Sequence, residues 1–262
     1  MIDNYITIII LLIFGFGSGI SVSIASGTSG SFLIPCLTIF IGRSIYQAIG
    51  ASLLVDCIIG GVAGLIFLKN GNVDMRSAFP LVVTGVIGAI LGSRFTSGAS
   101  PFGLSIFIGL FLIFVGVNFI VTGVQRNVEF IEGKINLKLF KENKILSFVI
   151  IGFIIGLASG FSGIGGGGLI ALFLIFVLGY DIHTAIGTSL IMMFFIAGSG
   201  AAVHFLNNEV IVNIAVIAGF AAVLGAISGS IVANKVDENK LGRLIGVIFL
   251  VLGIALILNL LF

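Results

Sequence analysis

The chain has 262 residues, of which 59% are hydrophobic and only 8% are charged, and its mean hydropathy is +1.34. Soluble domains carry roughly 25% charged residues, so this composition argues against a soluble domain and predicts an all-α polytopic membrane protein. The formal net charge is +2, and the 12 Lys and Arg residues are too few and too scattered for a nucleic-acid-binding surface.

Ten apolar stretches follow one another along the chain, and eight of them are long enough to cross a bilayer. The eight long stretches are 5–24, 48–68, 78–95, 102–124, 145–161, 185–206, 210–232 and 241–261. The two short stretches, 32–41 and 169–178, have about ten residues each, which as a helix covers roughly half of the hydrocarbon core. Because no basic segment precedes the first stretch, we interpret it as a retained span and not as a signal peptide.

The two halves of the chain repeat each other. Residues 48–53 read AIGASL and residues 185–190 read AIGTSL, at an offset of 185 − 48 = 137. The same offset aligns the glycine-rich stretch 86–93 with 223–230 without a gap. We therefore predict one transmembrane repeat over 1–124, a charged linker over 125–144 and a second repeat over 145–262.

The positions of the cationic residues predict the topology. If the short stretches cross the membrane, each repeat has five segments, and 10 of the 12 Lys and Arg residues collect on one face. Cationic loops stay in the cytoplasm, so this count predicts a cytoplasmic linker and two outside termini. Five segments also invert the second repeat relative to the first. The alternative, four full spans plus a re-entrant segment per repeat, divides the cations seven to five and favours neither orientation.

A run rich in Gly and Ser precedes each short stretch, at equivalent positions of the two repeats. The runs are SGTSGS at 26–31 and SGIGGGG at 162–168. Consecutive glycines disfavour a helix, so the backbone is predicted to break there. A short helix that begins after a break directs its positive end at the break, which suits an anion. The alternative is that these glycines only allow helices to cross closely.

The predicted substrate-binding residues come from both runs and from the spans that follow the short stretches. They are Ser26, Gly27, Thr28, Ser29, Gly30, Ser31, Ser162, Gly163, Gly165, Gly166, Gly167 and Gly168, with Ser52, Thr188 and Ser189 adding hydroxyl groups.

Asp56 lies inside the span 48–68, where a carboxylate is costly and usually functional. It is the candidate for proton coupling or for binding a coupled cation. The alternative is a protonated carboxyl hydrogen-bonded inside the bundle. The second repeat has Met193 at the equivalent position. His204, near the end of its span, is interpreted as an interfacial polar residue.

Glycines spaced by four residues are interpreted as helix-packing faces. They are Gly152, Gly156 and Gly160, with the pairs Gly88 and Gly92, and Gly225 and Gly229.

The segment GFSGIGGGGL at 160–169, the AIGTSL stretch at 185–190, and the first Ser/Gly run with Pro35 together resemble the TauE/SafE sulfite exporter family. The resemblance covers nearly the whole chain. It implies a multi-pass permease of a prokaryotic inner membrane that moves sulfur-containing anions such as sulfite, thiosulfate or organosulfonates. It also implies that the two Gly/Ser runs bind the substrate.

The helix breaks predict a transporter of a small anion, and the resemblance implies that this anion contains sulfur, with the lipid bilayer and the anion as the partners of a secondary transporter. A passive anion channel and a non-transporting subunit of a membrane complex are the alternatives. Neither a metal-ligand cluster nor a nucleophile–base arrangement appears in the sequence, so we predict no enzyme, no metal and no cofactor. The oligomeric state, a homo-oligomer included, stays open.

Overall fold

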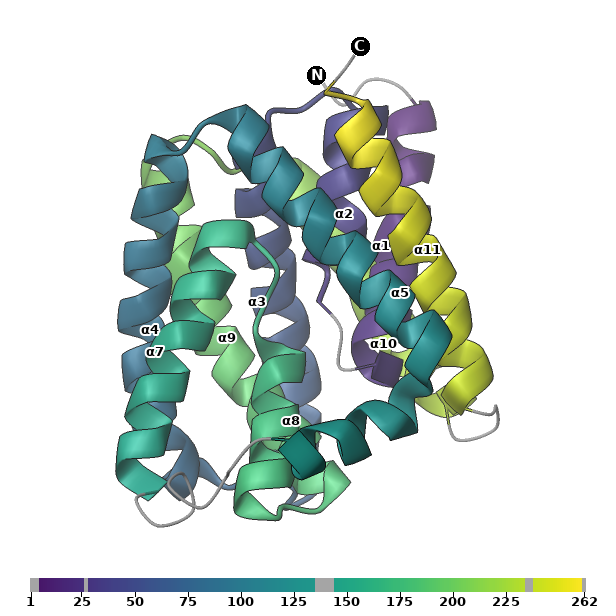
Figure 1. Cartoon of the computed structure of the whole chain (residues 1–262). Coiled ribbons are helices and arrows are strands. Elements are labelled where there is room, and N and C mark those ends of the chain that lie inside the picture. Colours follow the sequence, from purple (N-terminus) through teal and green to yellow (C-terminus); the bar gives the residue numbers. More distant parts are fainter. Residues whose placement is uncertain (1–4, 26–27, 135–143, 234–237, 261–262) are drawn as a thin grey trace.

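The computed structural model describes residues 5–25, 28–134, 144–233 and 238–260, and these residues contain helices and no strand (Figure 1). The first half contains α1 (Tyr5–Ala25), α2 (Gly30–Pro35), the π-helical turn η1 (Cys36–Phe40), α3 (Ile45–Lys69), α4 (Met75–Gly98) and α5 (Pro101–Lys134). The second half contains α7 (Lys144–Ser162), α8 (Gly167–Leu178), α9 (Ile182–Leu206), α10 (Val212–Ala233) and α11 (Glu238–Leu258). Helix α2 and η1 are continuous and form one short apolar segment, Gly30–Phe40.

The two central helices begin with the same kind of cap. Ser44 precedes α3, and its hydroxyl accepts a hydrogen bond from the Gln47 N–H at 3.3 Å. Asp181, at the equivalent position 44 + 137, precedes α9 and accepts from the Thr184 N–H at 3.0 Å. This hydrogen bond lowers the pKa of the Asp181 carboxyl. Side-chain caps satisfy N–H groups that have no partner inside the helix, so both starts are fixed locally.

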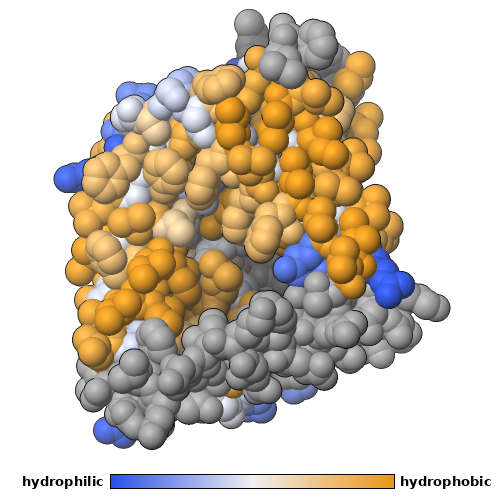
Figure 2. Space-filling model, in the orientation of Figure 1, coloured by the Kyte–Doolittle hydropathy of each residue, from blue (hydrophilic) through white to orange (hydrophobic). Residues whose placement is uncertain are grey.

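The distribution of polarity is that of a membrane protein. Six described helices have the length and apolar composition to cross a membrane. Large apolar side chains cover the flank of the bundle, while hydrophilic residues gather toward its two ends (Figure 2). Phe114 is 68% exposed, whereas Asp56 and His204 are completely buried. Since large apolar side chains face outward and hydrophilic residues gather at the two ends, lipid is the solvent that suits the flank of the bundle, and the chain is a multi-pass membrane protein.

Corresponding helices of the two halves begin at the predicted offset. Helices α8, α9, α10 and α11 start 137 residues after α2, α3, α4 and α5, because 167 − 30, 182 − 45, 212 − 75 and 238 − 101 all give 137. The start of α1 and the end of α11 lie at one end of the bundle, and the end of α5 and the start of α7 lie at the other (Figure 1). Each half therefore contributes an odd number of segments, as the five-segment arrangement requires and the four-span alternative does not.

The halves are interleaved and do not form two separate bundles. Helix α1 packs on α10, α4 on α7 and α5 on α11, while α3 and α9 pack against each other. The predicted packing faces are confirmed, since Gly156 lies against the Gly85 carbonyl, and Gly88 against the Phe153 carbonyl. At the contact between α10 and α1, which corresponds to that between α4 and α7, Gly225 lies against the Phe16 carbonyl. Without side chains at these positions the backbones approach closely, which is how helices associate in lipid.

Helix α5 is longer than the hydropathy predicted. The apolar stretch ends near residue 124, but the helix continues to Lys134, through the first half of the predicted linker. Polar residues such as Gln, Arg and Glu have high helix propensity, so the helix outlasts the apolar sequence. The rest of the predicted linker, 135–143, lies outside the described residues.

Candidate functional site

The first helix break connects the end of α1 to the start of α2. Of the predicted site residues, Ser26 and Gly27 lie outside the described part of the chain. Thr28 is only 6% exposed, and its hydroxyl has no hydrogen-bond partner among the described residues. Ser29 caps α2 through its carbonyl oxygen, which accepts from the Phe32 and Leu33 N–H groups at 3.1 and 2.9 Å. Gly30 and Ser31, both buried, form the first turn of α2.

The second break connects α7 to α8. Gly163 has a φ of +68°, a conformation that favours glycine, and its N–H donates to the Ser159 carbonyl at 2.9 Å. The Ser162 hydroxyl accepts from the Ile164 N–H at 3.2 Å, so this side chain holds the turn. Gly166 precedes α8 and supplies no side-chain cap. The first-turn N–H groups of α8, which begins at Gly167 and Gly168, therefore have no partner within their own helix.

The two breaks touch each other inside the protein. A methyl group at Gly30 would overlap the carbonyl oxygen of Gly163 and would lie 3.3 Å from the Cα atom of Ile164. Only hydrogen at this position allows the two backbones to meet. The start of α2 thus meets the second break, which leads into α8, although the two belong to different repeats.

One face of α3 lines both breaks. Ile49, Ser52 and Asp56 are spaced i, i+3 and i+7, which places them on one side of a helix. The Ser52 hydroxyl lies 2.9 Å from the Gly163 carbonyl and 2.8 Å from the Ile49 carbonyl. The Ser52 carbonyl accepts from the Ser29 hydroxyl at 2.9 Å. Ser52 therefore contacts the first break through its carbonyl and the second through its hydroxyl.

Asp56 completes this arrangement, because its two carboxyl oxygens face different breaks. Oδ1 accepts from the Ser29 N–H at 2.8 Å. Oδ2 lies against the Cα atom of Gly165, where a methyl group would overlap it, and has no hydrogen-bond partner among the described residues. The side chain is fully buried. A buried carboxylate needs a proton or positive charge beside it, and no described cationic side chain forms an ion pair with Asp56, which leaves the partial charge of the helix ends.

The hydroxyl groups predicted from the second repeat lie elsewhere. The Thr188 hydroxyl accepts from the Asp74 N–H at 3.0 Å, and the Tyr180 hydroxyl donates to the carboxylate of that same Asp74. The Ser189 hydroxyl donates to the Ile186 carbonyl of its own helix at 2.9 Å. Among the described residues, no hydrogen bond joins the Thr188 or Ser189 hydroxyl to the breaks, whereas Ser52, the equivalent of Ser189, touches both. The repeated sequence thus carries an asymmetric set of polar contacts.

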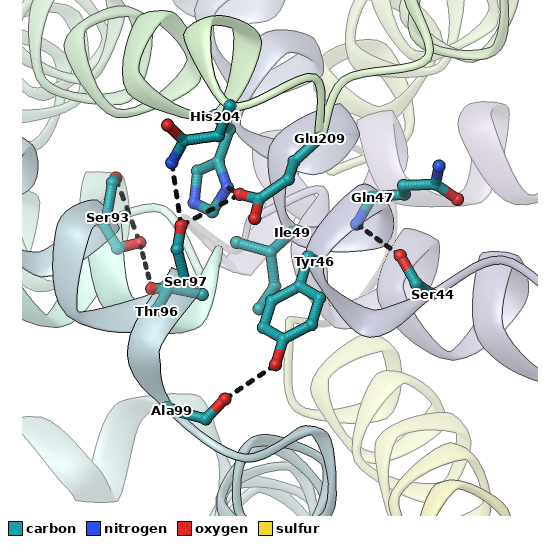
Figure 3. Close-up of polar contacts among 12 residues, drawn as sticks. Ser44, Tyr46, Gln47, Ile49, Ser93, Thr96, Ser97, Ala99, His204 and Glu209 are labelled. Atoms are coloured by element: carbon teal, nitrogen blue, oxygen red, sulfur yellow. Dashed lines mark hydrogen bonds and ion pairs between the residues drawn. The ribbon is translucent and has the colours of Figure 1, made fainter.

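A second polar cluster lies where α9 ends, and the sequence reasoning missed it (Figure 3). His204 Nδ1 lies 2.7 Å from Glu209 Oε2, and the imidazole is completely buried. The Ser97 hydroxyl donates to the same carboxylate oxygen at 3.2 Å and accepts from the Asn207 amide at 2.8 Å. This cluster joins α4 to the end of α9 and the turn that follows it. His204, interpreted from the sequence as an interfacial polar residue, lies in the last turn of α9 and is buried and paired with Glu209. No sequence spacing singled out Glu209.

Replacing Glu209 with alanine should lower the thermal stability of the purified protein. The substitution leaves the buried His204 Nδ1 without its acceptor, at a cost of about 1–3 kcal/mol. Glu209→Gln, whose amide oxygen can still accept from Nδ1, is the matched control and should lose less. Melting temperatures in one detergent measure the difference; equal values for Glu209→Ala and the wild type would mean that the pair contributes no stability.

The model of the family described as "Sulfite exporter TauE/SafE" matches residues 11–256. The chain belongs to the TauE/SafE family. The matched range contains both breaks and Asp56, as well as the cluster of His204 and Glu209. The resemblance inferred from the glycine runs and the AIGTSL stretch is therefore confirmed.

This TauE/SafE chain is also similar to the "Probable membrane transporter protein YunE" of Bacillus subtilis (strain 168). The two proteins are 23% identical over 152 residues, which is 55% of this chain and 55% of the relative. The match thus spans about half of the relative's length. No solved structure matches the chain.

Proposed function

We propose that the protein is a secondary transporter of small sulfur-containing anions, such as sulfite, thiosulfate or an organosulfonate, in the cell membrane of a prokaryote. The observation that carries this proposal is the contact between Gly30 and the Gly163 carbonyl, because it brings the two helix breaks together in the core of a membrane protein. The family's description as a sulfite exporter supports the assignment to sulfur anions, and the name of the Bacillus relative supports transport.

The proposed binding site uses backbone and hydroxyl donors in place of cationic side chains. Helix α8 begins at the second break with N–H groups that no side chain caps. The Thr28 hydroxyl is buried at the first break without a described partner. Helix ends and hydroxyl groups bind oxyanions through short N–H and O–H hydrogen bonds, and half-helices at the midplane are a recurring plan among transporters. An anion held this way needs no lysine or arginine inside the membrane.

The interleaved repeats supply a route to alternating access. We take 1–124 and 145–262 as the two inverted repeats and 125–144 as the cytoplasmic linker, with both termini outside, in agreement with the bias of 10 cations against two. Each repeat contributes one half-helix to the proposed site, so movement of one repeat against the other would open the site to either face in turn. The transported anion is not chemically altered, so we propose no enzymatic step.

Flux measurements in proteoliposomes test the proposed function. The panel is sulfite, thiosulfate, sulfoacetate, sulfate and chloride, each with and without a pH gradient, with empty vesicles as the control. Saturable and selective flux of a sulfur anion is the expected result. Equal flux of every anion would indicate a passive channel, and the absence of flux for the whole panel would contradict transport and favour a role as a subunit of a membrane complex.

Replacing Thr28 with valine should weaken binding of the transported anion without unfolding the protein. Valine has nearly the shape of threonine but lacks the hydroxyl, and a hydrogen bond to a charged group contributes about 1.5–3 kcal/mol, equivalent to roughly ten- to a hundredfold in affinity. Thr28→Ser, which keeps the hydroxyl, is the matched control. Half-saturation concentrations for flux measure the effect, and an unchanged value for Thr28→Val would remove Thr28 from the site.

A further inference from the structure

Asp56 occupies one backbone donor of the first helix break, beside the proposed substrate site. Its Oδ1 accepts from the N–H of Ser29, the residue that caps α2, at 2.8 Å. Its Oδ2 lies against Gly165, within the second break, and has no described partner. A carboxylate and a small oxyanion are both flat or compact groups of oxygen atoms with negative charge, and both accept from N–H groups at a helix end. Asp56 therefore stands where an anion would stand.

The surroundings of Asp56 offer no other charge to offset a second anion. No described cationic side chain forms an ion pair with it. Helices α2, α8 and α10 contain no ionisable side chain, and α1 contains only Tyr5, at its outer tip. On α9 the ionisable groups are His183 and His204, near its two ends. The thiols are Cys57, the neighbour of Asp56 on α3, and Cys36 in η1.

Two negative charges in this site would destabilise each other. At a separation of a few ångström, two like charges repel each other strongly even at the moderate effective dielectric of a protein surface. An ionised Asp56 therefore weakens binding of an anion in two ways: it repels the anion, and it accepts the hydrogen bond from the Ser29 N–H that the anion could otherwise accept. A neutral Asp56 removes the repulsion and releases a donor, and its own O–H becomes a further donor.

We propose that Asp56 is an internal substitute for the substrate anion, so that the anion and one proton bind together. This inference rests on the proposed function, and it adds the coupling ion and the stoichiometry. Because linkage is reciprocal, protonation of Asp56 tightens anion binding by the same factor by which the anion favours the proton. A pH difference across the membrane then drives the anion toward the alkaline side.

Only one of the two repeats has a titratable side chain at this position, so the proposed stoichiometry is one proton. The position equivalent to Asp56 is Met193 on α9, since 56 + 137 = 193. Met193 lies against the start of α8, where its sulfur atom would be 2.9 Å from a methyl group at Gly167. A thioether does not titrate, so the second repeat supplies no proton-binding side chain at the equivalent place.

Binding of thiosulfate to the purified protein, measured by calorimetry from mildly acidic to mildly alkaline pH, tests the inference. Thiosulfate keeps the same charge over this range, so any pH dependence belongs to the protein. In the wild type the affinity should fall by about tenfold per pH unit once Asp56 is ionised. Asp56→Asn, a neutral side chain of the same shape, should retain at every pH the affinity that the wild type shows in acid. Asp181→Asn, on the exposed cap of α9, should behave as the wild type.

A second measurement does not depend on a variant. At a pH where the affinity of the wild type is already falling, so that free Asp56 is ionised, binding of thiosulfate in weak buffer should take up one proton per anion. Binding without proton uptake, or a pH dependence that persists in Asp56→Asn, would overturn the inference while leaving the anion site standing. Loss of binding in a folded Asp56→Asn protein, or a requirement for Na⁺ at constant pH, would overturn it as well. If no anion of the panel binds the wild type at any pH, the proposed function fails together with it.

Discussion

Replacing Gly30 with alanine is expected to reduce sulfur-anion flux in proteoliposomes to the level of empty vesicles. The added methyl group would overlap the carbonyl oxygen of Gly163 and come within 3.3 Å of the Ile164 Cα atom. Both obstacles are backbone atoms, so no side-chain rotation relieves them. The two breaks must move apart, at a cost of about 1–3 kcal/mol for such overpacking, and the donors that converge on the anion separate with them.

Gly17→Ala is the matched control for this prediction. Gly17 lies on α1, and a methyl group there would lie 3.7 Å from the Phe32 ring of α2, an ordinary van der Waals contact. This variant should transport as the wild type does. Flux and melting temperature are measured for both proteins, so that loss of transport can be separated from loss of fold. Wild-type flux in Gly30→Ala would show that the breaks need not touch and that the anion binds elsewhere.

The number of helices and the position of the breaks could be predicted because each rests on a local property. Membrane spans follow from runs of apolar residues, and the breaks follow from glycines that cannot sustain a helix. The offset of 137 then relates the start of α8 to that of α2 without any structural information. The end of α5 was placed ten residues too early, since 134 − 124 = 10, because hydropathy reports where lipid ends and not where a helix ends.

The partners of each helix could not be predicted in the same way. A glycine face fits any backbone that approaches it, so Gly88 and Gly225 indicated close packing but not the helices against which they pack. The interleaving of α1 with α10 and of α4 with α7 depends on contacts between residues far apart in sequence. The pairing of His204 with Glu209 has a different origin: the two residues are only five positions apart, but their contact depends on the conformation of the turn after α9.

The polar contacts of the site follow from differences between the repeats. Ser52 and Ser189 are equivalent in sequence, yet only Ser52 has a broken helix within reach of its hydroxyl in the contacts described. The sequence singled out Asp56 as an intramembrane carboxylate but not its neighbour Gly165, which lies 165 − 56 = 109 residues away in the chain. A motif therefore located the breaks, while the three-dimensional structure was needed to identify the side chains that line them.

Alanine at Gly88 and at Gly225 should destabilise the protein by similar amounts, because the two positions are equivalent in the repeats. A methyl group at Gly88 would overlap the Phe153 carbonyl and lie 2.8 Å from the Leu157 nitrogen, across the seam between α4 and α7. At Gly225 it would overlap the Phe16 carbonyl and lie 3.0 Å from the Phe16 Cα atom, across the seam between α10 and α1. Alanine stabilises a helix relative to glycine by only about 0.5–1 kcal/mol. The overlap with backbone atoms costs about 1–3 kcal/mol or more, so the net effect of either substitution on the stability of the protein is a loss.

Melting temperatures in detergent measure these effects, with Gly98→Ala as the control. Gly98 is also on α4, but a methyl group there meets nothing within 4 Å, so this variant should melt at the wild-type temperature or slightly above it. The double variant at Gly88 and Gly225 should lose the sum of the single losses, because the two sites lie in different helix pairs and share no partner. A large loss from one single variant and none from the other would contradict the equivalence of the two seams, and wild-type stability in both would mean that these glycines do not set the approach of the helices.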